Sequence, residues 1–514
     1  MSVTAAFDVV IPDQNLNIAL HTTLGIPLAT PLTDEDLARV TVIHAAANGI
    51  ADLTGMEFCV NLVEADFSSN AIVDLMPLQG LIELAVLNIG YNAIDDLTAI
   101  GQLVKLRRLS MDVLKNTTVP DHVDISALSN LRQLNYLSAG ANYIHDVGPI
   151  ASLTQLETLI LDQNLIDNEQ AARLSALSNL TYLDIGEGAF SDASFIGSLV
   201  KLTHLGLNEC SFVSDISFLE SLGQLTELNL ANCGGIFDFS PLAGAIALTT
   251  LDVQSSSLRN HAILSTLVRL RKVNFSHTSA RNLDFLSNMS DLQEAIFQGN
   301  TISDLSALAG LDKLRIIYAL QNRIVDLTPV ANCSHLLEVN VSQNRVTALA
   351  PLEACPLVAL FADDNYLTDV DEMARFVSDV GVTSFDGNYY IGTPRQNAFR
   401  AVDPISVQVG GTVSQLFEAV YTQDGITYDA SSDIRDEDAF KMMQMVIADP
   451  SVAQGILRGV DPLAASLLYD IEGLKSGATA ASIHFRASSS IEAVMPFTTA
   501  AMSVPVTVVA APQA

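Results

Sequence analysis

The sequence repeats one short phrase at intervals of about 22 residues, and this period constrains the fold more than any other feature. The phrase contains two apolar residues separated by one residue, such as Leu87 and Ile89, and an asparagine three places later, here Asn92. We call the asparagine position the slot. Ten asparagines occupy slots: Asn48, Asn70, Asn92, Asn142, Asn164, Asn300, Asn322, Asn344, Asn365 and Asn388. Gly188, Cys210, Cys233, Ser256, Thr278 and Leu114 fill the others, which brings the total to 16.

One such unit is too small to fold alone, because a short strand and a return turn bury too little apolar surface to offset the chain entropy. Stacked units share a continuous core. The apolar pair points inward from a strand, and the later leucines point inward from the return segment. The pattern therefore predicts an α/β solenoid with one curved parallel sheet of about 16 repeats. We interpret the slot asparagines as a structural ladder that bonds backbone groups in the turns, not as ligand-binding residues.

Two phrases carry a family resemblance: "NAIVDLMPLQGL", starting at Asn70, and "NRIVDLTPVANC", starting at Asn322. They are similar to the 22-residue leucine-rich repeat of bacterial internalins. The resemblance implies a repeat solenoid over residues 41–395. The preceding segment resembles the helical cap of such arrays, so we expect residues 1–40 to form an N-terminal cap. Asp13 and Thr33, the latter with Asp36 three residues on, are suitable helix N-caps.

The period fails after Asn388, and a different pattern follows. The phrases "ADPSVA" and "IEGLKSGATAASIHFRA" resemble the bacterial immunoglobulin-like group 2 domain. The resemblance implies an all-β sandwich over residues 403–514. We expect residues of about 396–403 to join two separately packed units.

The five cysteines fit core positions of the repeats. Cys210 and Cys233 occupy slots, whereas Cys59, Cys333 and Cys355 fall where other repeats place a core leucine or within one residue of it. Buried cysteine behaves as a small apolar residue, so we interpret all five as core fillers. A disulfide between Cys210 and Cys233, in adjacent repeats, is the alternative.

Composition excludes several functions. The formal net charge is −33, with 58 acidic residues against 25 lysines and arginines. Such a chain is repelled by nucleic acid and by anionic lipid, so we expect neither as a partner, and we expect no membrane insertion. The phosphate loop, the zinc and serine hydrolase motifs and paired-cysteine zinc spacing are all missing from the sequence. We therefore predict a protein that is not an enzyme and has no cofactor.

An acidic cluster raises one metal question. It consists of Asp433, Asp436, Glu437 and Asp438, whose carboxylates suit calcium. Their spacing differs from that of an ordered calcium loop. A solvated loop without metal is the other interpretation.

The resemblance implies a protein that binds another protein, such as a host receptor, and mediates adhesion on an external surface. The opening "MSVTAAFDVV" has no signal-peptide pattern, which leaves three expectations open. The chain is a processed extracellular or cell-surface protein, a phage virion structural or decoration protein that contacts neighbouring subunits, or an intracellular scaffold.

Strand alternation predicts where a partner binds. The residue between the two apolar positions, and the one two places later, should lie on the concave face. Most of these residues are small or polar. The exceptions lie toward the end of the array, and we expect them to form the recognition surface: Ile296, Tyr318, Leu320 and Phe361, with Asp363 at its edge. Coverage of this patch by the second domain or by a neighbouring subunit is the alternative.

Overall fold

In the computed structural model, residues 6–114, 123–367 and 369–385 are described, and beyond them nine strands are described by their backbone. The chain divides into two compact units. The first contains Met1–Ala280 and Asp284–Asn300, and the second contains Arg281–Leu283 and Thr301–Ala514. This division falls within the repeats, and the expected junction at residues 396–403 stays a prediction. Asn388 and the acidic cluster at residues 433–438 lie outside the described residues.

A parallel sheet of 16 strands runs through the repeats, with its strands in the order of the sequence. The first unit contributes β3 (Val42–His44), β4 (Glu64–Asp66), β5 (Val86–Asn88), β6 (Arg108–Ser110), β7 (Tyr136–Ser138), β8 (Thr158–Ile160), β9 (Tyr182–Asp184), β10 (His204–Gly206), β11 (Glu227–Asn229), β12 (Thr250–Asp252), β13 (Lys272–Asn274) and β14 (Glu294–Ile296). The second contributes β15 (Ile316–Tyr318), β16 (Glu338–Asn340), β17 (Ala359–Phe361) and β18 (Val382–Ser384). Each strand has three residues, and from β3 to β17 the middle one is buried in the core: Leu87, Leu137 and Leu228 are at most 2% exposed. In the last strand, β18, the middle residue Thr383 is half-buried. The predicted repeat solenoid with a long parallel sheet is confirmed.

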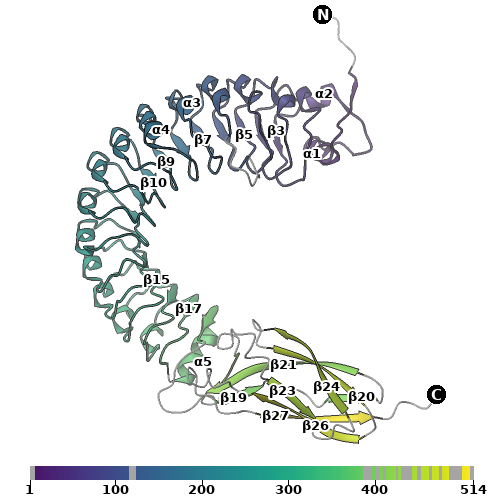
Figure 1. Cartoon of the computed structure of the whole chain (residues 1–514), viewed down its shortest axis with the longest axis vertical. Helices are drawn as coiled ribbons and strands as arrows, with labels where there is room; N and C mark the ends of the chain where they lie inside the picture. The colour runs from purple at the N-terminus through teal and green to yellow at the C-terminus, as the bar shows by residue number, and fades with distance from the viewer. Residues whose placement is uncertain are drawn as a thin grey trace, which may run out of the picture. The chain divides into compact units, whose positions relative to one another are not determined.

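The return segments of the repeats are short helices, most of them 3-10. In the first unit, strands line the inside of a bend and these helices lie outside (Figure 1). They are η1 (Met56–Phe58), η2 (Met76–Leu78), η3 (Ile100–Gln102), η4 (Ser126–Asn130), α3 (Gly148–Ala151), α4 (Asn168–Arg173), η5 (Leu174–Ala176), η6 (Ser194–Ser198), η7 (Ser217–Ser221), η8 (Ser240–Gly244), η9 (His261–Thr266) and η10 (Asp284–Leu286). The second unit has η11 (Ser306–Leu308), η12 (Thr328–Val330) and η13 (Ala350–Leu352). A unit of about 22 residues leaves room for one tight turn, which the 3-10 geometry supplies.

An aspartate starts many of these returns. The carboxylate of Asp96 accepts a hydrogen bond of 2.8 Å from the backbone N–H of Thr98, and Asp74 accepts one of 2.8 Å from Met76. Such Asx turns satisfy backbone donors at the start of a short helix. The hydrogen bonds from the Thr98 hydroxyl and backbone lower the pKa of Asp96. This aspartate lies four residues after the slot, which explains its recurrence in the repeat phrase.

The slot asparagines bond two repeats at once. The Asn92 carbonyl accepts from the Ile72 N–H at 3.0 Å, and its amide donates to the Phe67 and Ile89 carbonyls at 2.9 Å. Phe67 and Ile72 belong to the preceding repeat. A donation of this kind to the preceding repeat is made by Asn70, Asn92, Asn142, Asn164, Asn300, Asn344 and Asn365. Asn322 accepts from the Ile302 N–H at 3.0 Å.

Asn48 differs from the other slot asparagines, and its place in the ladder stays a prediction. Its side chain is exposed, and β3, which precedes it, is the first strand of the long sheet among the described residues. The N-terminal segment contacts this first repeat. Asp13 Oδ2 accepts from the backbone N–H groups of Ala51 and Asp52 at 2.7 and 3.2 Å, and Asn15 Nδ2 donates to the Gly49 carbonyl at 3.0 Å.

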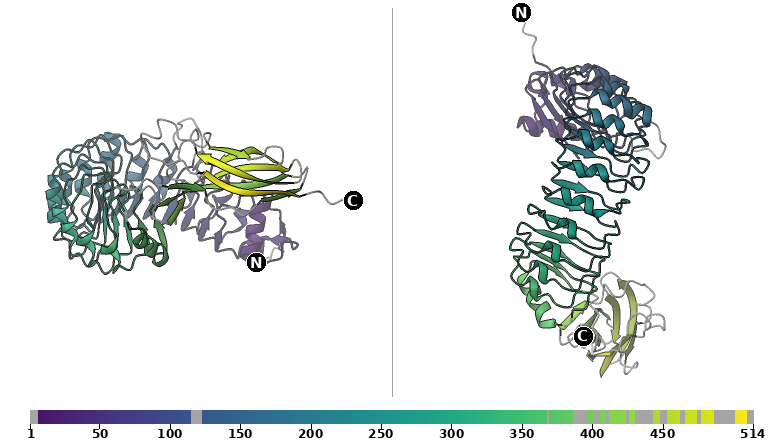
Figure 2. Two further views of the ribbon diagram at one scale, coloured as in Figure 1. Left: turned by 90° about the horizontal axis from the view of Figure 1, so that it is seen from below. Right: turned by 90° about the vertical axis from the view of Figure 1, so that its left-hand side faces the viewer.

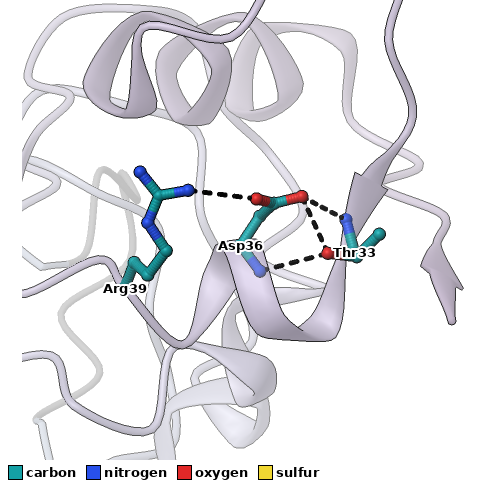
Figure 3. Close-up of polar contacts among 3 residues, drawn as sticks. All are labelled: Thr33, Asp36 and Arg39. Carbon is teal, nitrogen blue, oxygen red and sulfur yellow. Dashed lines mark hydrogen bonds and ion pairs between the residues drawn. The ribbon is translucent and has the colours of Figure 1, made fainter. Parts of the chain in front are cut away.

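Two helices and a two-stranded antiparallel sheet make up the N-terminal segment. Their bounds are β1 (Asp8–Val9), α1 (Gln14–Leu24), β2 (Leu32–Thr33) and α2 (Asp34–Leu37). Asp13 Oδ1 accepts from the Asn15 and Leu16 N–H groups, so Asp13 is the N-cap of α1. A capping box starts α2: the Thr33 N–H and hydroxyl donate to the Asp36 carboxylate, and the Asp36 N–H donates to Thr33 Oγ1 (Figure 3). Arg39 adds an ion pair of 3.2 Å to Asp36.

The second unit continues from the repeats through helix α5 (Val370–Asp379) to β18. Nine strands follow: β19 (Gln396–Phe399), β20 (Ile405–Gln408), β21 (Thr412–Gln423), β22 (Ile426–Asp429), β23 (Met443–Ile447), β24 (Ala453–Asp461), β25 (Ser466–Gly473), β26 (Gly477–Phe485) and β27 (Ala501–Val509). They form one sheet in the order β19-β21-β25-β24, with β22 paired to β21, and a second in the order β20-β27-β26-β23. Strand β19 starts before the expected domain boundary at 403. The immunoglobulin-like assignment stays a prediction.

The five cysteines are free thiols. Cys59, Cys210, Cys233 and Cys333 are buried, whereas Cys355 is half-buried, which corrects the expectation that all five are core fillers. The thiols of Cys210 and Cys233 donate to the Ile185 and Leu207 carbonyls at 3.5 and 3.0 Å. Burial raises the pKa of Cys233 to about 12 and that of Cys210 to about 11. The two thiols therefore substitute for slot amides, and no disulfide joins them.

Candidate functional site

The strands of the first unit follow one another along its parallel sheet (Figure 2). The first and third residues of each strand form two rows of side chains on the open face of this sheet. The paired strands are in register, so the first residues of successive strands are neighbours, and so are the third residues. From β6 to β14 the first-residue row is Arg108, Tyr136, Thr158, Tyr182, His204, Glu227, Thr250, Lys272 and Glu294. The third-residue row is Ser110, Ser138, Ile160, Asp184, Gly206, Asn229, Asp252, Asn274 and Ile296.

A hollow of about 270 Å³ lies over β9 to β13. Five residues of the first-residue row line it: Tyr182, His204, Glu227, Thr250 and Lys272. Asp184, Gly206, Asn229, Asp252 and Asn274 line it from the third-residue row. We call this feature the β9–β13 hollow.

Gly206 makes room for the Asp184 carboxylate. A Cβ at position 206 would lie 2.6 Å from Asp184 Oδ1, which is closer than real Cβ contacts. The carboxylate therefore leans across the neighbouring strand into space that any other residue would fill. Asp162 and Gly140 are related in the same way: a Cβ at position 140 would lie 2.5 Å from Asp162 Oδ1.

Acidic side chains in and beside the hollow differ in how strongly they are desolvated. Burial raises the pKa of Asp184, and the hydrogen bond of 3.2 Å from the Gly186 N–H lowers it in part. Burial also raises the pKa of Asp162, to which the nearby Asp184 and Asp112 charges contribute. These carboxylates are partly desolvated and repel one another, so they attract a cation more strongly than exposed carboxylates do.

The other charged residues of the hollow have partners. Glu227 pairs with His204 at 3.0 Å, and Lys272 pairs with Glu294 at 3.0 Å. Asp252 accepts from Asn274 Nδ2 at 3.0 Å. Among the residues that the structure describes, Asp184 is thus the one acidic group of the hollow without a side-chain donor.

Aromatic rings accompany the carboxylates in the first-residue row. The Tyr182 and His204 rings stack with centroids 5.4 Å apart and an interplanar angle of 26°. Nearer the N-terminus, the Arg108 guanidinium lies 4.0 Å from the centroid of the Tyr136 ring. The row can therefore hold planar groups against its tyrosines.

The residues predicted to bind a partner lie on three strands and the segments that follow them. Tyr318 on β15 aligns with Asn340 on β16, and Asn340 aligns with Phe361 on β17. Tyr318, Leu320, Phe361 and Asp363 are all half-buried. The Tyr318 hydroxyl donates to Glu338 Oε1 at 2.6 Å, and Ser384 donates to Asp363 Oδ1 at 2.5 Å. Ile296, also half-buried, ends β14 in the first unit.

The sequence reasoning did not identify the β9–β13 hollow. It considered the residues after the first apolar position of each strand and omitted the residue before it. Tyr182, His204, Glu227 and Lys272 all precede that position, and strand alternation also places them on the open face. The signal was available in this alternation, whereas the hollow itself depends on Gly206.

The described ranges of the chain contain neither a metal-binding cluster nor a membrane-spanning helix. No group of three or more His, Cys, Asp or Glu side chains there is arranged to hold a metal ion. No helix in those ranges is both long and apolar enough to cross a bilayer.

Solved structures resemble this chain, although no family model and no curated protein matches its sequence. A leucine-rich repeat protein of Leptospira interrogans superposes with a TM-score of 0.53 and 19% identity, over 70% of this chain and 97% of that chain. An internalin of Listeria monocytogenes matches with a TM-score of 0.46 and 23% identity, over 75% of this chain and 99% of that chain. Internalin C2 of the same organism matches with a TM-score of 0.37 and 29% identity, over 49% and 100%. The period, the parallel sheet and the Leptospira likeness together define the fold as a leucine-rich repeat solenoid.

Proposed function

We propose that this protein is a non-enzymatic binding protein whose partner is another protein, held on the open face of the sheet. The observation that supports this proposal is the β9–β13 hollow, where aromatic and charged side chains surround a depression in a surface of small and polar residues. Aromatic and charged groups in such depressions supply most of the energy of protein recognition. The formal net charge of −33 disfavours nucleic acid and anionic lipid as alternatives.

A second contact region is proposed in the second unit. It consists of Tyr318, Leu320 and Phe361, with Asp363 at its edge, and we call it the aromatic patch. The Tyr318 ring is held by its hydroxyl bond to Glu338, so little side-chain entropy is lost when a partner covers it. Ile296 is proposed as a separate contact in the first unit.

The proposed setting is an external surface, where the protein mediates adhesion to a host receptor or to a neighbouring structural subunit. The support is the similarity of the repeat phrases to internalins. The proposed immunoglobulin-like domain over residues 403–514 would act as a spacer.

The test begins with a screen of the purified full-length chain against a displayed library of extracellular protein domains. Partners found in the screen are then measured against the double variant Tyr318→Ala with Phe361→Ala, which should weaken binding by at least about tenfold. The matched control replaces Tyr91 and Phe212, which are 60% and 68% exposed, with alanine. Thermal unfolding of each variant is recorded alongside.

Unchanged affinity of the double variant would remove the aromatic patch from the proposed function. A large loss of thermal stability would instead assign Tyr318 and Phe361 to the core. A screen that yields no protein partner for the wild type would count against protein binding itself.

A further inference from the structure

The β9–β13 hollow has the size of a subsite for one side chain. Its volume of about 270 Å³ is below the roughly 300–1,000 Å³ of small-molecule pockets. It lies on the open face of the sheet, accessible to a protruding residue of a partner.

The charged side chains of the hollow favour a partner residue with a positive charge. Three acidic side chains, Asp184, Glu227 and Asp252, line it. Lysine and histidine are also present, but Lys272 is paired with Glu294 and His204 with Glu227. Asp184 receives only the backbone N–H of Gly186, so its remaining lone pairs are available to a donor from a ligand.

The shape of the hollow selects a planar cation. Because Gly206 has no side chain, the Asp184 carboxylate leans over its strand, and this carboxylate and the stacked pair Tyr182 and His204 line the same depression. A guanidinium is flat, stacks on aromatic rings and donates two parallel hydrogen bonds to a carboxylate, whereas an ammonium is a compact point charge. The same sheet already holds one guanidinium in this manner, because Arg108 lies over Tyr136 in the first-residue row.

We propose that the β9–β13 hollow binds an arginine side chain of the protein partner, with its guanidinium against the Asp184 carboxylate above Gly206 and beside the Tyr182–His204 stack. This inference rests on the proposed function, because it specifies the chemistry of the partner at the same face. Asp184 and Gly206 are the residues that determine specificity, and Glu227 and Asp252 add attraction at longer range.

The experiment uses the full-length chain and three capped tripeptides: acetyl-Gly-Arg-Gly-amide, the corresponding lysine peptide, and the citrulline peptide, which is a neutral analogue of arginine. Binding is followed by NMR titration of the His204 ring resonance in protein labelled at histidine Cε1. The resonance is assigned by comparison with the variant His204→Gln. The arginine peptide should shift this resonance and bind at least about tenfold more tightly than the citrulline peptide, with the lysine peptide in between.

Two variants and one control complete the design. Asp184→Asn removes the charge with almost no change in shape, and Gly206→Ala fills the space into which the carboxylate leans. Each should weaken arginine binding by about tenfold or more. The control Asp66→Asn removes the same charge from the same row on β4, where the carboxylate already accepts from the Ser68 N–H and hydroxyl, and it should leave binding unchanged.

Equal binding of the arginine and citrulline peptides would overturn the proposal, as would wild-type affinity in both Asp184→Asn and Gly206→Ala. Lack of any His204 shift with the arginine peptide at saturating concentration would overturn it as well. If Asp184→Asn fails to fold, the Gly206→Ala variant and the citrulline comparison still decide the matter. Failure of the partner screen alongside a positive peptide titration would reject the proposed function and leave the arginine subsite in place.

Discussion

The identity of the slot residue determines how each turn is bonded to the repeat before it. The sequence predicts that slot asparagines bond backbone groups, because an amide has both donors and an acceptor. That the bonding partner is the preceding repeat becomes clear only once the repeats are stacked. For this reason the sequence did not distinguish Asn48 from the other slot asparagines. The substituted slots vary: Cys233 still donates to the Leu207 carbonyl, whereas the buried Ser256 hydroxyl has no hydrogen-bond partner.

This contrast gives a paired prediction. Asn164→Ala should destabilise the protein by about 3 kcal/mol, since it leaves the buried Ile144 N–H without its acceptor and the Ala139 carbonyl without its donor. Ser256→Ala should change stability by less than about 0.5 kcal/mol, because its hydroxyl makes no bond to lose. Urea unfolding followed by circular dichroism measures both. Equal effects of the two substitutions would contradict this account of the slots.

Among the secondary-structure elements, the first residues of the N-terminal helices were easier to predict from local sequence than the return segments of the repeats. Asp13 and the Thr33 and Asp36 pair were predictable as helix starts, because capping depends on residues three apart in the chain. Helices α3 and α4 and the 3-10 turns did not follow from pattern, because a return of a few residues adopts whatever conformation the stacking requires. Strand β19 was also not anticipated, since its partner β21 lies beyond the range of local pattern.

Asp13 joins α1 to the first repeat, and its removal is the prediction at this scale. Asp13→Ala should lower stability by about 1–2 kcal/mol, because four backbone N–H groups lose their acceptor. Burial raises the pKa of Asp13, but hydrogen bonds from the N–H groups of Ala51, Leu16, Asp52 and Asn15 lower it below its ordinary value overall.

The lowered pKa determines the pH dependence of this effect. A carboxylate with a depressed pKa in the folded state stabilises the protein above its unfolded pKa, and the contribution disappears as the pH falls through the folded pKa. The wild type and Asp13→Ala should therefore differ at neutral pH and converge at strongly acidic pH. Asp8→Ala, which removes an exposed carboxylate from β1, is the control. A difference that persists unchanged into acid would exclude the carboxylate as its source.

For the whole molecule, the period alone predicted the stacking order, because each repeat pairs with its neighbours in sequence. The β9–β13 hollow was beyond such reasoning. It requires the register of five strands and the missing side chain of Gly206 at the same time, and neither is visible in any single repeat. Function at the surface thus depends on departures from the repeat, whereas the fold depends on its regularity.

The last prediction concerns how the solenoid ends. In the part of the chain that the structure describes, strands β19 to β27 pair with one another. The repeats end in α5 and β18, where Met373, Phe376 and Phe385 are buried. A chain that stops at Arg395 keeps every repeat strand, so it should fold and unfold with a midpoint close to that of the full-length protein. A chain that stops at Cys355 loses β17, α5 and β18 and leaves the Val341 carbonyl without the Asn365 amide. This shorter chain should be markedly less stable and should aggregate, since it exposes the apolar edge that a terminal repeat normally covers. Thermal melts and gel filtration compare the three chains, and failure of the chain ending at Arg395 to fold would show that the solenoid requires the strands that follow it.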